Sequence, residues 1–240
     1  MEVNNLDNKE SDSNIDGCNM DGLIKDFGQI ILNNNNKGYK IHLLNIIGEI
    51  EGHENAAPVT KTSKYEHIIP LLAAVEENQS IDGLLVILNT IGGDVESGLA
   101  IAEMISSISK PTVCLVLGGG HSIGVPLAVS GDVTFIVPTA TMIIHPIRVG
   151  GMVLGVKQNF EYIERLQERI IDFTVKHSNM DKSLMKELMF NTKELTKDIG
   201  SILVGEQAVK CGLIDRVGGI NDALNELYDL INQLKYNKLS

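Results

Sequence analysis

The sequence predicts an α/β protein built on a parallel sheet. Three apolar runs rich in β-branched residues indicate buried strands at 41–50, 83–89 and 112–117. Between them lie segments whose apolar residues fall three or four apart, which is the spacing of amphipathic helices. Repeated strand–helix units of this kind favour a parallel sheet, because each helix returns the chain to the edge where the next strand starts.

The first half of the chain alternates regularly between the two element types. A polar loop at 53–64 follows the first strand, and a helix is expected at 65–77. A second helix is expected at 95–108, and Pro111 ends it. After the third strand, the residues GGGHS are expected to turn the chain into a short helix at 123–130.

The second half adds strands at 133–137 and 141–145 and then a long helix at 156–176. This helix carries one long apolar stripe with no strand beside it, so we expect it to project and to pack on something else. A short strand is expected at 212–215 and an amphipathic closing helix at 221–235.

Two regions follow from composition. Residues 1–38 hold seven acids, three bases and nine asparagines, which is typical of a disordered acidic leader. Residues 39–240 are expected to form a single folded domain.

The overall composition limits the function. The 240-residue chain has a formal net charge of −11 and 4% aromatic residues, so it offers nucleic acid neither a basic surface nor many stacking platforms. Its three cysteines are odd in number and widely spaced, which indicates neither a disulfide framework nor a zinc site. No metal or cofactor is expected. Because the N-terminus lacks the features of a signal peptide and no run reaches ~18 apolar residues, we expect a cytoplasmic protein.

The strongest chemical signal is the pentapeptide Gly120-His121-Ser122-Ile123-Gly124, between a buried strand and a helix. A serine on such a turn exposes its hydroxyl, and the next amide, that of Ile123, points to where an oxyanion would form. The alternative is a glycine-rich turn whose serine only caps a helix.

A serine nucleophile needs a base, and His145 ends an apolar strand just before Pro146. Histidines at such places are often merely packed or solvated. His121 is not assigned as the base, because adjacent side chains in a turn diverge. The remaining histidines are interpreted as packed or solvated residues: His42, His53, His67 and His177.

A second glycine-containing turn, Asn89 to Asp94, also joins a strand to a helix. Its two glycines could offer a backbone amide to an anion. Nucleotide binding is disfavoured, because neither a GKS/T element nor a GxGxxG pattern is present. A second oxyanion donor beside Ser122 is the better interpretation.

Together, the segments NTIGGDVESGLAIAEMI, GGGHSIGVPLA, TATMIIHP and GEQAVKCGLID resemble the Clp-type serine peptidases in order and approximate spacing, over roughly residues 41–218. The resemblance implies a ClpP/crotonase-like superhelix of ββα units, in which 156–176 is a projecting handle helix. It also implies a homo-oligomer of stacked heptameric rings that acts on polypeptides.

The same resemblance assigns roles to individual residues. It makes Ser122 the nucleophile, His145 the base, and the amides of Gly93 and Ile123 the oxyanion hole. Further likeness in KTSKYEHIIP, FEYIERLQER and TKDIG is to a branch of the family from spore-forming bacteria. That likeness implies help with preprotein export, by degrading signal peptides or precursors.

The chain departs from the family pattern in two places. Counting back from GLID, Gly200 stands where the family places the triad aspartate, and Asp198 lies two residues earlier. Loss of the acid from a serine–histidine–aspartate triad costs about 10⁴ in kcat, so a replacement is of interest. We take Asp198 as the candidate third member, with Asp172 and Asp181 as weaker substitutes. The leader and the loop near 54–64 also differ, so dependence on a partner ATPase is left open for this chain, without support from the sequence.

Three alternatives remain. A ring with a degenerate triad could act as a non-proteolytic export or chaperone factor. An α/β-hydrolase esterase would share the GxSxG pattern, but that fold places its histidine late in the chain. A crotonase-type coenzyme A enzyme would leave the Ser122 and His145 pair without a purpose.

Overall fold

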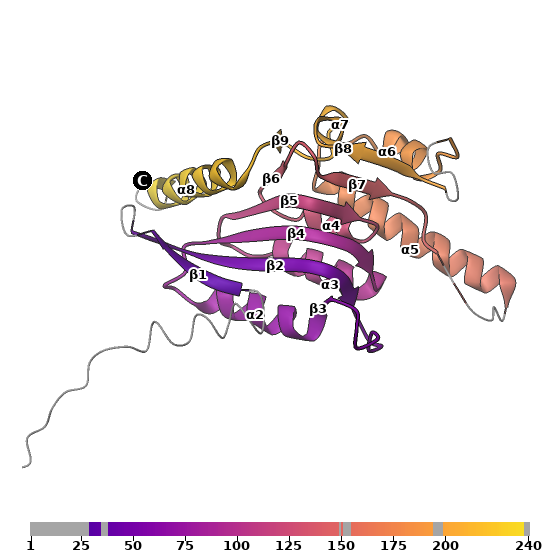
Figure 1. Ribbon diagram of the computed structural model, residues 1–240, viewed down its shortest axis with the longest axis horizontal. Coiled ribbons are helices and arrows are strands. Elements are labelled where there is room, and N and C mark those ends of the chain that lie inside the picture. The colour runs from indigo at the N-terminus through magenta and orange to yellow at the C-terminus, as the bar shows by residue number, and fades with distance from the viewer. Residues whose placement is uncertain (1–28, 35–37, 149, 151–154, 194–198, 238–240) are drawn as a thin grey trace, which may run out of the picture.

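The computed structural model describes residues 29–34, 38–148, 150, 155–193 and 199–237. Within these ranges the chain forms one nine-stranded sheet flanked by helices (Figure 1). The strands are β1 (Gln29–Asn34), β2 (Tyr39–Glu51), β3 (Thr62–Lys64), β4 (Gly83–Gly93), β5 (Thr112–His121), β6 (Val133–Ile136), β7 (Thr141–Ile144), β8 (Ser201–Val204) and β9 (Arg216–Val217). The helices are α2 (Tyr65–Glu77), α3 (Val95–Ser106), α4 (Gly124–Ala128), α5 (Val156–Lys176), α6 (Lys182–Met189), α7 (Glu206–Lys210) and α8 (Ile220–Asn237). The α/β class that the sequence predicts is confirmed.

The centre of the sheet is parallel and covered on both faces. Strands β2, β4, β5 and β6 pair in parallel. Side chains of β4 and β5 alternate between two apolar clusters, one shared with α2, α3 and α4 and the other with α8. This burial explains the continuous apolar runs in the sequence, because a strand covered on both faces has no polar side.

Both central strands run further than the sequence indicates. The turns expected after residues 89 and 117 are strand instead, since β4 continues to Gly93 and β5 to His121. Their glycines stay in the sheet because they pair with neighbours, Gly93 with Ile50 and Gly120 with Met142. The turn that follows β5 therefore shrinks to Ser122 and Ile123.

The end of β5 changes partner. Its first part pairs with β6, whereas its last residues pair with β7 in parallel. Strand β7 in turn pairs antiparallel with β8. In Figure 1 the arrowheads of β4, β5 and β7 point to the same side, toward α5. The carboxyl ends of these strands are where ligands commonly bind in α/β proteins.

Strand β1 lies inside the stretch that the sequence assigned to the leader. It pairs antiparallel with β2, from Gln29 opposite Leu44 to Asn34 opposite Tyr39. The sheet therefore starts before residue 41, where the sequence predicted its first strand. The rest of the expected leader, 1–28 and 35–37, lies outside the described residues. The short strand expected at 212–215 is also displaced, because β9 follows it.

Helix α5 has the bounds that the sequence predicts, and only its second half packs on the domain. Leu166, Ile170 and Ile171 are buried there. The first half extends away from the sheet in Figure 1, and Val156 and Phe160 are 75% and 67% exposed. The first half of the helix therefore presents an apolar stripe that the described part of the chain leaves largely exposed.

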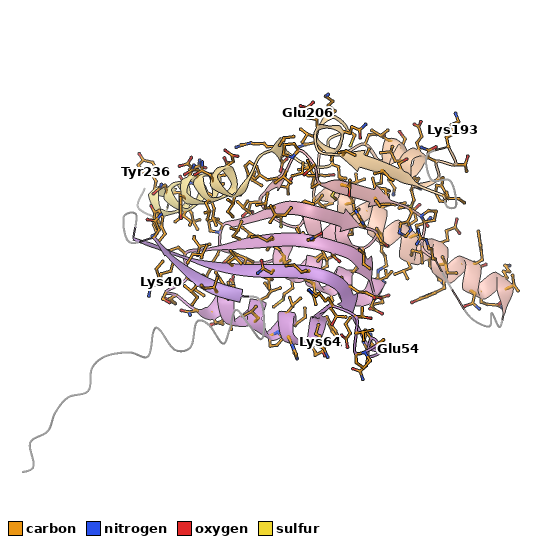
Figure 2. All side chains as sticks on the ribbon, in the orientation of Figure 1. Lys40, Glu54, Lys64, Lys193, Glu206 and Tyr236 are labelled. Atoms are coloured by element: carbon orange, nitrogen blue, oxygen red, sulfur yellow. The ribbon has the colours of Figure 1, made fainter. Side chains whose placement is uncertain are left out.

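The loop between β2 and β3 is held at its base by the carboxylate of Glu51. This group accepts hydrogen bonds from Thr62 Oγ1 and the Ala56 amide, and it pairs with Lys64 at 3.4 Å. The hydrogen bond from Thr62 leads the effects that hold the pKa of Glu51 below its ordinary value. Figure 2 shows Glu54 at the outer end of this loop and Lys64 nearer the sheet. The base of the loop thus lies beside the end of β4, with which β2 pairs.

Candidate active site

Ser122 lies in the tight connection between β5 and α4. Its φ is +58°, the only positive φ of a non-glycine residue in the described part of the chain. Side chains avoid this region, and residues held in it are concentrated at functional sites. Two hydrogen bonds fix the backbone here: Ser122 N donates to the carbonyl of Ile143 at 2.9 Å, and Val125 N donates to the carbonyl of Ser122 at 3.0 Å. The backbone of the serine is therefore held in this conformation.

Glycines on both sides make room for this turn. A β-carbon built on Gly92 would lie 2.7 Å from the β-carbon of Ser122. A β-carbon built on Gly124 would lie 2.7 Å from Cγ2 of Thr90. Contacts this short do not occur between real β-carbons and their neighbours, so glycine is required at both positions. The two glycine motifs of the sequence are thus parts of one packed site.

Strand pairing brings His145 to the serine. Strands β5 and β7 are parallel neighbours, with His121 opposite Ile143, so the residues after each strand emerge at the same edge. Ser122 and His145 both line a pocket of about 210 Å³ at this edge. No hydrogen bond joins them within the ranges that the structure describes, although catalytic hydrogen bonds are often long before substrate binds.

Most of the residues that line this pocket are apolar, and they come from several elements. Strand β4 and helices α3 and α4 form one side, the segment after β7 another, and α5 with α6 close it. The apolar lining residues are Ile91, Val95, Ile123, Val125, Ile144, Ile147, Ile170, Met185 and Met189. Such a pocket suits an apolar side chain held next to a reacting group.

The ring of His145 has a definite hydrogen-bond partner. Its Nδ1 lies 2.7 Å from the carbonyl oxygen of Pro146. His121 is engaged elsewhere, with Nε2 2.8 Å from Oγ1 of Thr141. Burial is the main cause that lowers the pKa of His121. As expected for adjacent side chains in a turn, His121 is not among the residues that line the pocket with Ser122.

Two backbone amides are available at the pocket. Asp94 N donates to the carbonyl of Ile50 at 3.0 Å. Bonding groups alternate along a strand, so the amide of the preceding residue, Gly93, faces away from β2. The Ile123 amide donates to no backbone group among the described residues. Gly93 and Ile123 both line the pocket beside Ser122.

The position of the expected acid is closed. Gly200 has a φ of +139°, and a β-carbon built on it would lie 2.3 Å from the carbonyl oxygen of Ile144 and 2.8 Å from the β-carbon of His145. No side chain fits there. Asp198, the candidate third member, lies outside the described residues. The weaker candidates are engaged elsewhere, since Asp172 pairs with Lys182 and Asp181 caps α6.

Sequence reasoning missed two parts of this site. The first is the Pro146 carbonyl, for which the dipeptide His145-Pro146 was the only available signal. The second is helix α6, which contributes Met185 and Met189 to the pocket. The apolar spacing of these two methionines is the signal that could have revealed it.

The fold, and a pocket that holds a serine and a histidine, are those expected of a Clp-type serine peptidase, and the sequence comparisons support this class. The chain belongs to the Clp protease family, whose family model matches residues 56–221. It is 57% identical over 193 residues to the translocation-enhancing protein TepA of Halalkalibacterium halodurans, which covers 80% of this chain and 75% of that protein. It is also 27% identical over 176 residues to the ATP-dependent Clp protease proteolytic subunit 1 of Chlamydia muridarum, covering 71% of this chain and 85% of that one. The resemblance seen in the motifs is therefore confirmed.

Among the described residues, every helix is too short or too polar to cross a bilayer.

Proposed function

We propose that the protein is a serine endopeptidase in which Ser122 is the nucleophile, His145 the general base, and the amides of Gly93 and Ile123 the oxyanion hole. One observation carries this proposal: the strained backbone of Ser122 in a pocket that also holds His145. A serine hydroxyl is a weak nucleophile near neutral pH, and a nearby base is what activates it. A serine that only capped a helix would not need a strained backbone.

The proposed reaction follows from these positions. Ser122 Oγ attacks the peptide carbonyl carbon while Nε2 of His145 takes the hydroxyl proton. The negative charge that develops on the carbonyl oxygen is stabilised by the amides of Gly93 and Ile123. His145 then gives the proton to the leaving amine, the C–N bond breaks, and an ester remains on Ser122. A water molecule, deprotonated by His145, hydrolyses the ester and restores the enzyme.

The proposed substrates are polypeptides of the export pathway, including signal peptides. The name of the TepA relative supports this assignment. The apolar residues among those that line the pocket support it independently, because the central region of a signal peptide is a run of 7–15 apolar residues. Met185 and Met189 add flexible side chains that can adapt to several apolar residues.

The proposed assembly is a homo-oligomer of stacked heptameric rings, as the family resemblance implies. The uncovered first half of α5, with Val156 and Phe160 exposed, supports a contact of this helix with another subunit. A requirement for a partner ATPase is not part of the proposal.

The experiment is hydrolysis of a quenched-fluorescence peptide that contains the apolar core of a signal sequence. The matched control peptide replaces that core with serine and asparagine. We expect cleavage of the apolar peptide by the wild-type protein and loss of at least about 10³-fold in Ser122→Ala and His145→Gln. Equal cleavage by wild type and Ser122→Ala would contradict the assignment of the nucleophile. Equal cleavage of both peptides would contradict the assignment of the substrate.

A second candidate function is a non-proteolytic ring that assists export or acts as a chaperone. The closed position at Gly200 favours it, because a side chain there, such as the acid that the resemblance implies, has no room. This candidate predicts that wild type and Ser122→Ala suppress aggregation of an unfolded preprotein equally and that neither cleaves it. Cleavage by wild type alone would exclude it.

A further inference from the structure

We propose that the backbone carbonyl of Pro146 orients the imidazole of His145, so that the site works as a serine–histidine dyad without a carboxylate. This inference rests on the proposed function, because it names the group that positions the proposed base. Pro146 is a positioning residue, since it acts through His145 and does not contact the reacting atoms.

A catalytic histidine requires a particular tautomer. To accept the serine proton, Nε2 must carry a lone pair, so the ring proton must sit on Nδ1. In a triad, the acid enforces this by accepting a hydrogen bond from Nδ1. Any acceptor held in the ring plane can do the same, whether or not it carries a charge.

The Pro146 carbonyl is such an acceptor. It lies 2.7 Å from Nδ1 of His145. A carbonyl oxygen can only accept a hydrogen bond, so the bond requires the proton to be on Nδ1. Nε2 is then left unprotonated, as a general base needs. Among the described residues, this is the only hydrogen bond that the ring of His145 makes.

The sequence stiffens this arrangement. The proline ring fixes φ of Pro146 near −65°, and it disfavours the helical region for the residue before it, His145. The dihedral angles between the imidazole and its acceptor are thereby restricted. An acceptor one residue away on a flexible chain would order the ring far less.

The backbone of Gly200 excludes an acid at position 200 itself. Strand β8 is held against β7, with Ser201 opposite Ile144, and this pairing presses Gly200 against His145. A side chain built from Gly200 would collide first with the Ile144 carbonyl, 2.3 Å away. The chain therefore has glycine where the resemblance expects an acid, and the packing at that point admits only glycine.

The two acceptors differ in one respect. A carbonyl fixes the tautomer as a carboxylate does, but it has no full charge to stabilise the imidazolium that forms during attack. Charge-assisted hydrogen bonds are roughly twice as strong as neutral ones. We therefore expect Ser122 to react slowly, but faster than the serine of a triad whose histidine has the wrong tautomer.

The first measurement reads the tautomer directly. Full-length assembled protein labelled with ¹⁵N at its histidines is studied by magic-angle-spinning NMR near neutral pH, and the His145 signals are assigned by their absence in His145→Gln. We expect a protonated Nδ1 and an unprotonated Nε2. A proton on Nε2 would overturn the inference, whether or not the protein has activity.

The second measurement compares rates of labelling by a fluorophosphonate, which reacts at the serine and needs little of the peptide pocket. We expect Pro146→Gly to lower the rate about tenfold, the worth of one hydrogen bond, and Pro146→Ala to lower it less. Pro58→Gly, in the exposed loop after β2, is the matched control and should keep the wild-type rate. In Pro146→Gly the NMR signals should also show a mixture of tautomers.

Asp198→Asn separates the inference from a triad. We expect its labelling rate to stay within about threefold of wild type. A fall to the level of His145→Gln would show that a carboxylate is required and would overturn the inference. Absence of labelling in the wild type would instead overturn the proposed function, while the NMR result would still decide how His145 is oriented.

Discussion

Gly92 and Ser122, thirty residues apart in the sequence, are packed so closely that a β-carbon on the glycine would lie 2.7 Å from the β-carbon of the serine. The last residues of β4 therefore form part of the support for the serine turn. The serine turn can form only if residue 92 has no side chain. This explains why a glycine, with a φ of +96°, stands at position 92.

Gly92→Ala tests that relationship. The added methyl group must displace Ser122, and a displacement near 1 Å costs about a hundredfold in rate. We expect a loss of that size in fluorophosphonate labelling, with circular dichroism unchanged. Gly219→Ala is the matched control, because a β-carbon there meets no atom within 4 Å. Equal rates in the two variants would show that the contact does not position the serine.

Restoring an acid at position 200 is expected to fail. In Gly200→Asp the side chain would collide with the Ile144 carbonyl, and the φ of +139° is unfavourable for aspartate. We expect a loss of about 2 kcal/mol or more in unfolding free energy and no gain in labelling rate. Gly219→Asp provides the comparison in urea titrations. An active and stable Gly200→Asp variant would contradict the conclusion that no side chain fits at position 200.

His42 makes stability depend on pH. Burial lowers its pKa from 6.5 to about 4, and its Nε2 has no partner among the described residues. The unfolded chain binds the proton first as pH falls, so this contribution is complete above about pH 6.5 and is lost toward pH 4. From about pH 7 to about pH 5, wild type should lose about 2 kcal/mol more than His42→Leu in urea unfolding. Parallel pH curves for the two proteins would contradict this.

Helix α5 should be held by apolar packing more than by its ion pair with α3. Ile171 is fully buried, whereas Arg169 and Glu96 form a bidentate pair between largely exposed side chains. We expect Ile171→Ala to cost about 3 kcal/mol and Glu96→Gln less than about 1 kcal/mol. Denaturant midpoints measure both. A larger loss of stability in Glu96→Gln than in Ile171→Ala would show that the ion pair contributes more than the apolar packing.

The exposed half of α5 should matter for assembly and not for folding. Phe160→Ser removes apolar surface that this chain leaves uncovered, so it should shift the proteins in sedimentation velocity toward smaller species. Glu164→Ser, on an exposed polar position of the same helix, should leave the distribution unchanged. Identical distributions for wild type and Phe160→Ser would place the subunit contact elsewhere.

The sequence predicted those parts of the fold whose signal is local. Helices α2 and α5 have the predicted bounds because their apolar residues repeat at helical spacing and no strand competes for them. The extension of β4 through Gly93 was missed, because glycine resembles a turn when its pairing with β2 is unknown. Strand β1 was missed because its short apolar patch gains meaning only beside β2.

For the site, too, the sequence predicted the local features and missed those that depend on pairing and packing. Ser122 and His145 could be singled out because a strand-to-helix turn and a strand end are visible in the sequence. That they share a pocket depends on the pairing of β5 with β7, which the sequence does not encode locally. The bond from His145 to Pro146 and the tight contact at Gly200 are geometric facts that no spacing of residues reveals.

The central claim is that Ser122 is an activated nucleophile, and intact-mass spectrometry after exposure to a fluorophosphonate tests it most directly. The wild-type chain should gain the mass of one phosphonyl group, located by peptide mapping on Ser122, while Ser122→Ala should gain none and His145→Gln should react at least about a hundredfold more slowly. An unmodified wild-type chain, or equal modification of Ser122→Ala, would contradict the claim.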